Sequence, residues 1–164
     1  MAAAAAHRVA GRLDAAAESL AAARAVDPFH PRVAFASAQL ASLRCDWSSA
    51  ARDYAAASVG EQEAQQRGRA HFGLGVALHM QAKAEGRPLE VEPARDAFLA
   101  ASRERPDDAR PLLALAALLR GAGRLQEARQ AAAKAAQLDS AALPQLAELD
   151  AALQQEPNNA RTPS

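Results

Sequence analysis

The chain alternates between long runs of small and apolar residues and short polar segments that contain Asp, Pro or Gly. Within the runs, apolar positions recur three and four residues apart, which is the spacing of one face of an α-helix. Stop signals such as Asp27-Pro28 and Gly121-Ala122-Gly123 separate the runs. This pattern predicts helices near residues 2–9, 12–26, 30–44, 47–58, 62–83, 91–104, 108–121, 125–137 and 143–155.

The segments between the stops repeat one another at a fixed interval. Ala16 and Ala50 lie 34 positions apart, and so do Ala94 and Ala128, whereas Ala50 and Ala94 lie 44 apart. An interval of this length is typical of stacked helical hairpins. The ten extra residues belong in loops, most of them in a long turn at 82–92 and the rest around 59–65.

Each repeat also pairs its small residue with a larger one a helical turn later. These larger residues are Leu20, Tyr54 and Phe98, with Ala132 as the atypical fourth; a second alanine follows at Ala23, Ala57, Ala101 and Ala135, and the triplet Gly-Arg-Leu occurs at 11–13 and 123–125. The pattern resembles the tetratricopeptide repeat, although Ala34, His71 and Leu112 stand where that family has an early tryptophan. The resemblance implies an all-α, right-handed α-solenoid of about four helix-turn-helix repeats with a C-terminal capping helix.

The repeat spacing also predicts how the chain is divided. We expect one array over 1–155, with repeats near 1–30, 31–64, 65–108 and 109–142 and a cap at 143–155, followed by a disordered tail at 156–164. Met1 falls inside the first helix of the first repeat, which is therefore short. Either the chain is a fragment of a longer array, or its alanine-rich first helix serves as a frayed cap.

Composition supports helices and argues against a sheet. Of the 164 residues, 48 are alanine, only six are valine, Thr162 is the single threonine, and isoleucine is absent, so residues favoured in strands are scarce. With only 4% aromatic residues, the helices must approach closely along alanine-lined faces to bury enough surface.

Charge and cysteine content limit the classes of partner and the cellular compartment that we expect. The formal net charge is zero, which argues against a nucleic-acid partner. Arginine outnumbers lysine 17 to two, a bias typical of a GC-rich bacterial genome. Cys45 alone cannot form an internal disulfide, and no run is long and apolar enough for a membrane span, so we expect a cytoplasmic protein without a membrane partner.

No catalytic or cofactor motif stands out. The four histidines, His7, His30, His71 and His79, make no metal-binding pair, and no phosphate-binding or nucleophile motif is present. We therefore expect no enzyme activity, no cofactor and no metal. The leading hypothesis is a protein-interaction adaptor; the alternative is a fragment or accessory domain of a larger enzyme, such as a glycosyltransferase or sulfotransferase.

The resemblance also implies where a partner binds, because the first helices of the repeats line a groove in that family. At the family's groove positions an arginine recurs, followed one turn later by an apolar residue on the same face. This stripe favours an acidic peptide or protein partner. The candidate groove residues are Arg32, Phe35, Gln39, Arg69, Phe72, Val76, His79, Arg110, Leu113 and Arg120.

Overall fold

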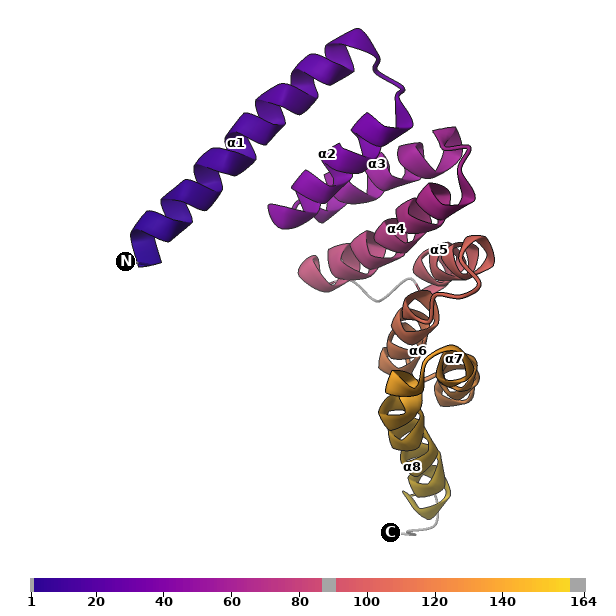
Figure 1. The fold of residues 1–164 in the computed structure, drawn as a ribbon. Coiled ribbons are helices and arrows are strands. Elements are labelled where there is room, and N and C mark those ends of the chain that lie inside the picture. Colours follow the sequence, from indigo (N-terminus) through magenta and orange to yellow (C-terminus); the bar gives the residue numbers. More distant parts are fainter. Residues whose placement is uncertain (1, 87–90, 160–164) are drawn as a thin grey trace.

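A computed structural model describes residues 2–86 and 91–159, and in this part of the chain every regular element is helical. The helices follow one another as antiparallel neighbours (Figure 1). They are α1 (Ala2–Val26), α2 (Pro31–Leu43), α3 (Trp47–Gly60), α4 (Ala64–Ala84), α5 (Val91–Glu104), α6 (Arg110–Gly121), α7 (Leu125–Leu138), the 3-10 turn η1 (Ser140–Ala142) and α8 (Leu143–Asn159). The all-helical repeat fold expected from the sequence is confirmed.

The helix starts are set by local sequence signals. The Asp46 carboxylate accepts a hydrogen bond from the Ser49 N–H at the start of α3, and the His30 ring accepts one from the Arg32 N–H at the start of α2. Pro31 and Pro111 occupy the first turns of α2 and α6, where a missing N–H costs nothing. These signals explain why the expected helices from residue 30 onward match α2 to α8 to within a few residues, apart from the end of α8.

Two of the tight turns use the same backbone device. Cys45 between α2 and α3 has φ 57°, and Gly123 between α6 and α7 has φ 74°, both in the left-handed region. The next residue then donates its N–H back into the helix, from Asp46 to the Ala41 carbonyl and from Arg124 to the Leu119 carbonyl, each at 2.9 Å. This is the geometry of a Schellman helix end. The long turn expected at 82–92 includes residues 87–90, which lie outside the described residues.

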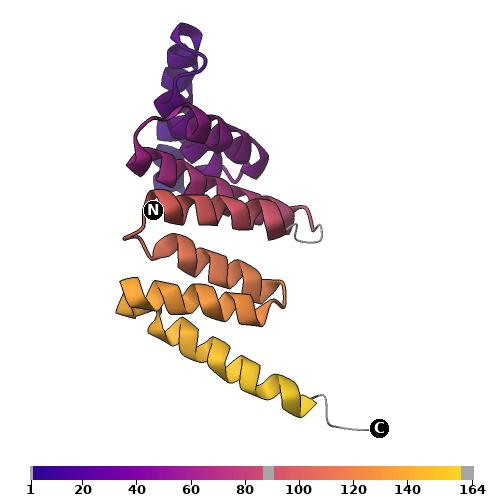
Figure 2. The same ribbon diagram turned by 90° about the vertical axis from the view of Figure 1, so that its right-hand side faces the viewer.

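The hairpins α2/α3, α4/α5 and α6/α7 stack side by side in two layers. Contacts are largely between neighbours along the chain, and α2 also contacts α4, which contacts α6 in turn, so these helices form one layer. Figure 2 shows α5 to α8, coloured salmon to yellow, following one another along the stack. A stack of this kind holds no central core. Instead, each pair of neighbouring helices buries its own apolar seam.

Alanine fills the seams. Ala38, Ala50, Ala77, Ala116 and Ala128 are all fully buried. Larger residues occupy the space that remains, chiefly Tyr54 in one cluster and Phe98, Leu115, Leu118 and Leu149 in another. Small residues allow the close helix approach that the composition predicts.

The first repeat does not form the expected hairpin. Helices at 2–9 and 12–26 were expected, but α1 runs without a break from Ala2 to Val26 and diverges from α2 toward its N-terminus (Figure 1). Gly11 stands in the register of Cys45 and Gly123 but stays helical, because alanine-rich sequence on both sides favours continuing the helix. Ala16 is consequently exposed, whereas its counterparts Ala50, Ala94 and Ala128 are buried.

The C-terminal helix packs on the last hairpin and is longer than expected. Leu149 of α8 is fully buried in a cluster with residues of α6 and α7. The helix continues to Asn159, and residues 160–164 lie outside the described residues, so the disordered tail expected at 156–164 stays a prediction. Gln154 and Gln155 are good helix formers, and an exposed helix can extend through them without further packing.

Ion pairs join helices across the seams. Arg24 of α1 lies 2.5 Å from Asp53 of α3, Arg67 of α4 lies 2.6 Å from Glu104 of α5, and Arg124 before α7 lies 2.5 Å from Glu92 of α5. Arg67 donates hydrogen bonds to both oxygens of Glu104, and this bidentate geometry strengthens an arginine–carboxylate pair. These three arginines thus help to hold neighbouring helices together.

Candidate groove between α2, α4 and α6

The largest described hollow opens between the helices of one layer and has a volume of about 490 Å³. Three successive helices, α2, α4 and α6, supply most of its wall, and α3 and the loop before α6 supply the rest. Its lining residues are Phe35, Gln39, Ser42, Trp47, Tyr54, Arg69, Phe72, Gly73, Val76, Arg105 and Arg110. No acidic residue belongs to this described lining.

Aromatic rings form the apolar part of the wall. The rings of Phe35 and Tyr54 meet edge to face with centroids 5.5 Å apart, and those of Phe72 and Phe98 lie 5.9 Å apart. Phe35 and Phe72 are only half-buried, so each keeps ring surface open to a ligand. Burial raises the pKa of the Tyr54 hydroxyl, which keeps this residue neutral in the wall.

Gly73 explains how the Tyr54 ring reaches this position. A Cβ atom added to Gly73 would lie 2.5 Å from the Tyr54 ring, much closer than real Cβ contacts allow. The absent side chain thus lets α4 pass directly over the ring. The wall therefore depends on glycine at this position of α4.

The three arginines at the rim differ in how much of their charge is available. Arg110 donates to both oxygens of Asp108 at 2.8 Å, and Arg105 lies 2.7 Å from the same carboxylate. Arg110 lowers the pKa of Asp108, which therefore stays ionised and offsets one of these two positive charges while accepting hydrogen bonds from both arginines. Arg69, by contrast, is exposed and has no hydrogen-bond or ion-pair partner among the described residues.

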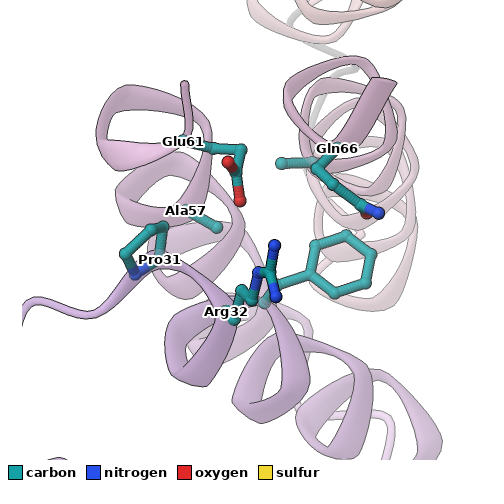
Figure 3. Close-up of a pocket in the computed structure, with 7 residues that line it drawn as sticks. Pro31, Arg32, Ala57, Glu61 and Gln66 are labelled. Carbon is teal, nitrogen blue, oxygen red and sulfur yellow. The ribbon is translucent and has the colours of Figure 1, made fainter. Parts of the chain in front are cut away.

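A smaller hollow of about 240 Å³ lies beside the first and shares Phe35 with it. The side chains of Arg32, from α2, and Glu61, which follows α3, point into it, and Gln66 of α4 lies on the facing side (Figure 3). Arg32 is held only loosely, since its guanidinium lies 3.4 Å from Glu63 and both side chains are largely exposed. The two hollows form a continuous surface along α2 and α4.

The structure brings together seven of the ten candidate groove residues. Phe35, Gln39, Arg69, Phe72, Val76 and Arg110 line the larger hollow, and Arg32 lines the smaller one with Phe35. Their role in binding stays a prediction. They were assigned from the groove positions of the resembled family, at which an arginine and an apolar residue recur one turn apart.

The other three candidates lie away from both hollows. Arg120 lies 2.8 Å from Glu148 of α8, and the Leu113 carbonyl accepts a hydrogen bond from Gln145 of α8. The capping helix therefore occupies the surface that the fourth repeat would otherwise offer. His79 is half-buried, and its Nδ1 atom is buried without a hydrogen-bond partner among the described residues. Burial lowers the pKa of this histidine.

Trp47, Tyr54 and Arg105 line the hollow without having been predicted as groove residues. The family pattern assigns the groove to the first helix of each repeat, whereas Trp47 and Tyr54 belong to the second helix of theirs. The unusual tryptophan at the start of α3 was the available signal, because a large aromatic residue at a turn is rarely left without a contact.

No group of three or more His, Cys, Asp or Glu side chains among the described residues is arranged to hold a metal ion. No described helix is both long and apolar enough to cross a bilayer.

The fold is an all-helical repeat array. Among solved structures, the chain is similar to that of Pseudomonas aeruginosa PilF, with a TM-score of 0.60. The two sequences are 19% identical, and the match covers 88% of this chain and 68% of that one. PilF is a protein that contains tetratricopeptide repeats. No protein-family model matches the sequence, and no curated protein does.

Proposed function

We propose that the chain is a non-catalytic adaptor of the tetratricopeptide repeat family that binds a peptide or a partner protein in the groove between α2, α4 and α6. The observation that carries the proposal is the hollow of about 490 Å³. In it the half-buried rings of Phe35 and Phe72, from two repeats, lie beside Arg69, which has no partner among the described residues. Rings and arginine side chains are the groups that most often dominate protein interfaces.

The charges favour an acidic partner. Arg69 is free to pair with a carboxylate, Arg32 is only loosely paired, and the lining of the larger hollow contributes no negative charge. A solvated, partly screened pairing of this kind weakens as ionic strength rises, but the apolar contacts of Phe35 and Phe72 do not. Binding should therefore decrease with salt without disappearing.

Affinity capture with matched variants tests the proposal. The double substitution Arg69→Glu and Phe72→Ala is compared with Arg103→Glu, a charge reversal at an exposed position of α5 outside the hollow. Circular dichroism confirms that each variant is folded. Proteins retained by wild type and by Arg103→Glu but lost from the groove variant support the groove. Equal retention by wild type and both variants would contradict the proposed groove.

A further inference from the structure

The contents of the larger hollow specify more than an acidic partner. Resting on the proposed function, we propose that this hollow recognises a short peptide segment in which one large apolar side chain stands next to a single carboxylate. The apolar side chain lies between Phe35 and Phe72, and the carboxylate pairs with Arg69. Three features of the wall lead to this assignment.

The first feature is the size and chemistry of the cavity. Its volume of about 490 Å³ exceeds that of one large side chain together with part of the adjoining backbone, and four aromatic residues, Phe35, Trp47, Tyr54 and Phe72, contribute to the lining. Rings favour another ring edge to face, so phenylalanine is the best-suited guest. A purely acidic segment would leave this apolar surface unfilled.

The second feature is the charge balance at the rim. Asp108 accepts both Arg110 and Arg105, and its carboxylate is the acceptor that both arginines already use. Arg69 is left as the cation of this hollow with no described partner. One free guanidinium accommodates one carboxylate, and the other two arginines already share Asp108.

The third feature is the fixed position of Arg69 relative to the rings. Arg69 and Phe72 are three residues apart on α4, on the same face and one turn from each other. Val76 continues that face by one more turn into the same hollow. A helix thus sets the separation between the cationic and apolar contacts, which selects guests in which the two groups are close together.

The chain contains a built-in reporter for this binding. Trp47 is its only tryptophan and lines the hollow, so a guest that fills the cavity changes the fluorescence of this one residue. The probe is the blocked peptide acetyl-Gly-Ser-Phe-Glu-Ser-Gly-amide. Matched peptides carry Gln in place of Glu, or Ala in place of Phe.

Titration of the full chain should give a saturable fluorescence change with the Phe-Glu peptide. Removing the carboxylate should weaken binding about threefold or more, as expected for a partly screened charge pair, and removing the phenyl ring should weaken it further. Arg69→Gln should bind the Glu and Gln peptides equally. Arg103→Gln should keep the wild-type preference.

Three results would overturn the inference: no saturable binding of the Phe-Glu peptide, equal binding of the Glu and Gln peptides by wild type, or an undiminished preference in Arg69→Gln. These failures are distinguishable from failure of the adaptor proposal. If a partner captured by wild type is still lost from the groove variant, the groove binds something of different chemistry, and only the peptide assignment is wrong.

Discussion

Gly73 and Gly75 of α4 each face an aromatic ring, but on different neighbours. The backbone of Gly73 lies against Tyr54 of α3, and that of Gly75 lies against Phe98 of α5. A Cβ atom at Gly75 would lie 2.7 Å from the Phe98 ring. Two glycines within one turn therefore let α4 approach both of its hairpin neighbours closely, at the cost of the backbone freedom that glycine adds to the unfolded chain.

Gly73→Ala should consequently destabilise the protein, although alanine is the better helix former. Forcing a methyl group against a packed ring typically costs about 1–3 kcal/mol, more than the gain in helix propensity of about 1 kcal/mol. Urea unfolding followed by circular dichroism measures the change. Gly121→Ala is the matched control, because nothing lies within 4 Å of its added Cβ, and it should be neutral or stabilising.

Cys45 offers a substitution with the opposite sign. Its φ of 57° is costly for a residue with a side chain by about 1–2 kcal/mol, and the equivalent turn uses Gly123. Cys45→Gly should therefore stabilise the protein by roughly 0.5 kcal/mol once the added freedom of the unfolded chain is subtracted. A lower unfolding midpoint in urea for Cys45→Gly than for wild type would contradict this interpretation of the turn.

At this scale the sequence predicted contacts within a helix better than contacts between distant segments. The spacing of Arg69, Phe72 and Val76 was enough to place them on one surface. The pairing of Arg120 with Glu148 joins residues 28 positions apart and depends on how α8 packs, which no local pattern contains. Arg110 pairs with Asp108 only two residues away, a local contact that the groove pattern did not include.

Among the elements, the hairpins owe their close packing to alanine at fixed positions. Ala94 on α5 and Ala128 on α7 are 1% and 0% exposed, and each contributes to the cluster that joins the last two hairpins. A bulkier residue at either site must push two helices apart. The repeat register assigned from sequence thus corresponds to the buried seam in these hairpins.

Ala128→Leu should lower the free energy of unfolding by about 1–3 kcal/mol, because the seam has no space for three additional carbon atoms. Ala94→Leu should behave similarly. Ala56→Leu serves as the control, since Ala56 is exposed on α3 and leucine is nearly as good a helix former as alanine. Thermal melts of all three variants that coincide with wild type would refute the assigned seam.

The uninterrupted α1 shows where reasoning by repeats fails at the level of elements. Gly-Arg-Leu at 11–13 and at 123–125 is the same triplet, yet one is helical and the other forms a turn. At the second site, Arg124 meets Glu92 of α5 and Glu127, contacts that fix the turn against the preceding hairpin. At Gly11 nothing lies within 4 Å of an added Cβ, so no comparable contact fixes a turn there and helix propensity continues α1.

For the molecule as a whole, charge and burial predict a loss of stability in acid. Arg67 lowers the pKa of Glu104 below its ordinary 4.5, and Arg110 lowers that of Asp108 below 3.8. Burial lowers the pKa of His71 and His79 below 6.5. In all four cases the unfolded chain binds protons more readily than the folded one, so stability must fall as pH falls.

The decline should occur in two stages. Between about pH 7 and 5 the histidines of the unfolded chain gain protons that the buried rings resist, and below about pH 4.5 the paired carboxylates become protonated. Urea titrations across this range measure the effect. The double variant His71→Gln and His79→Gln should remove the first stage and keep the second; stability that rises on acidification would show that the assigned shifts are wrong.

Contacts among the described residues are almost entirely between adjacent helices. The width of the hollow is therefore set by the seams between neighbouring helices and not by a direct contact across it. In such a stack, small rotations at successive seams add along the series. Alanine seams suit such movement, since small side chains interlock less deeply than large ones. A guest held between α2 and α6 can therefore set the curvature of the array, and the force that resists it is distributed over every joint between them.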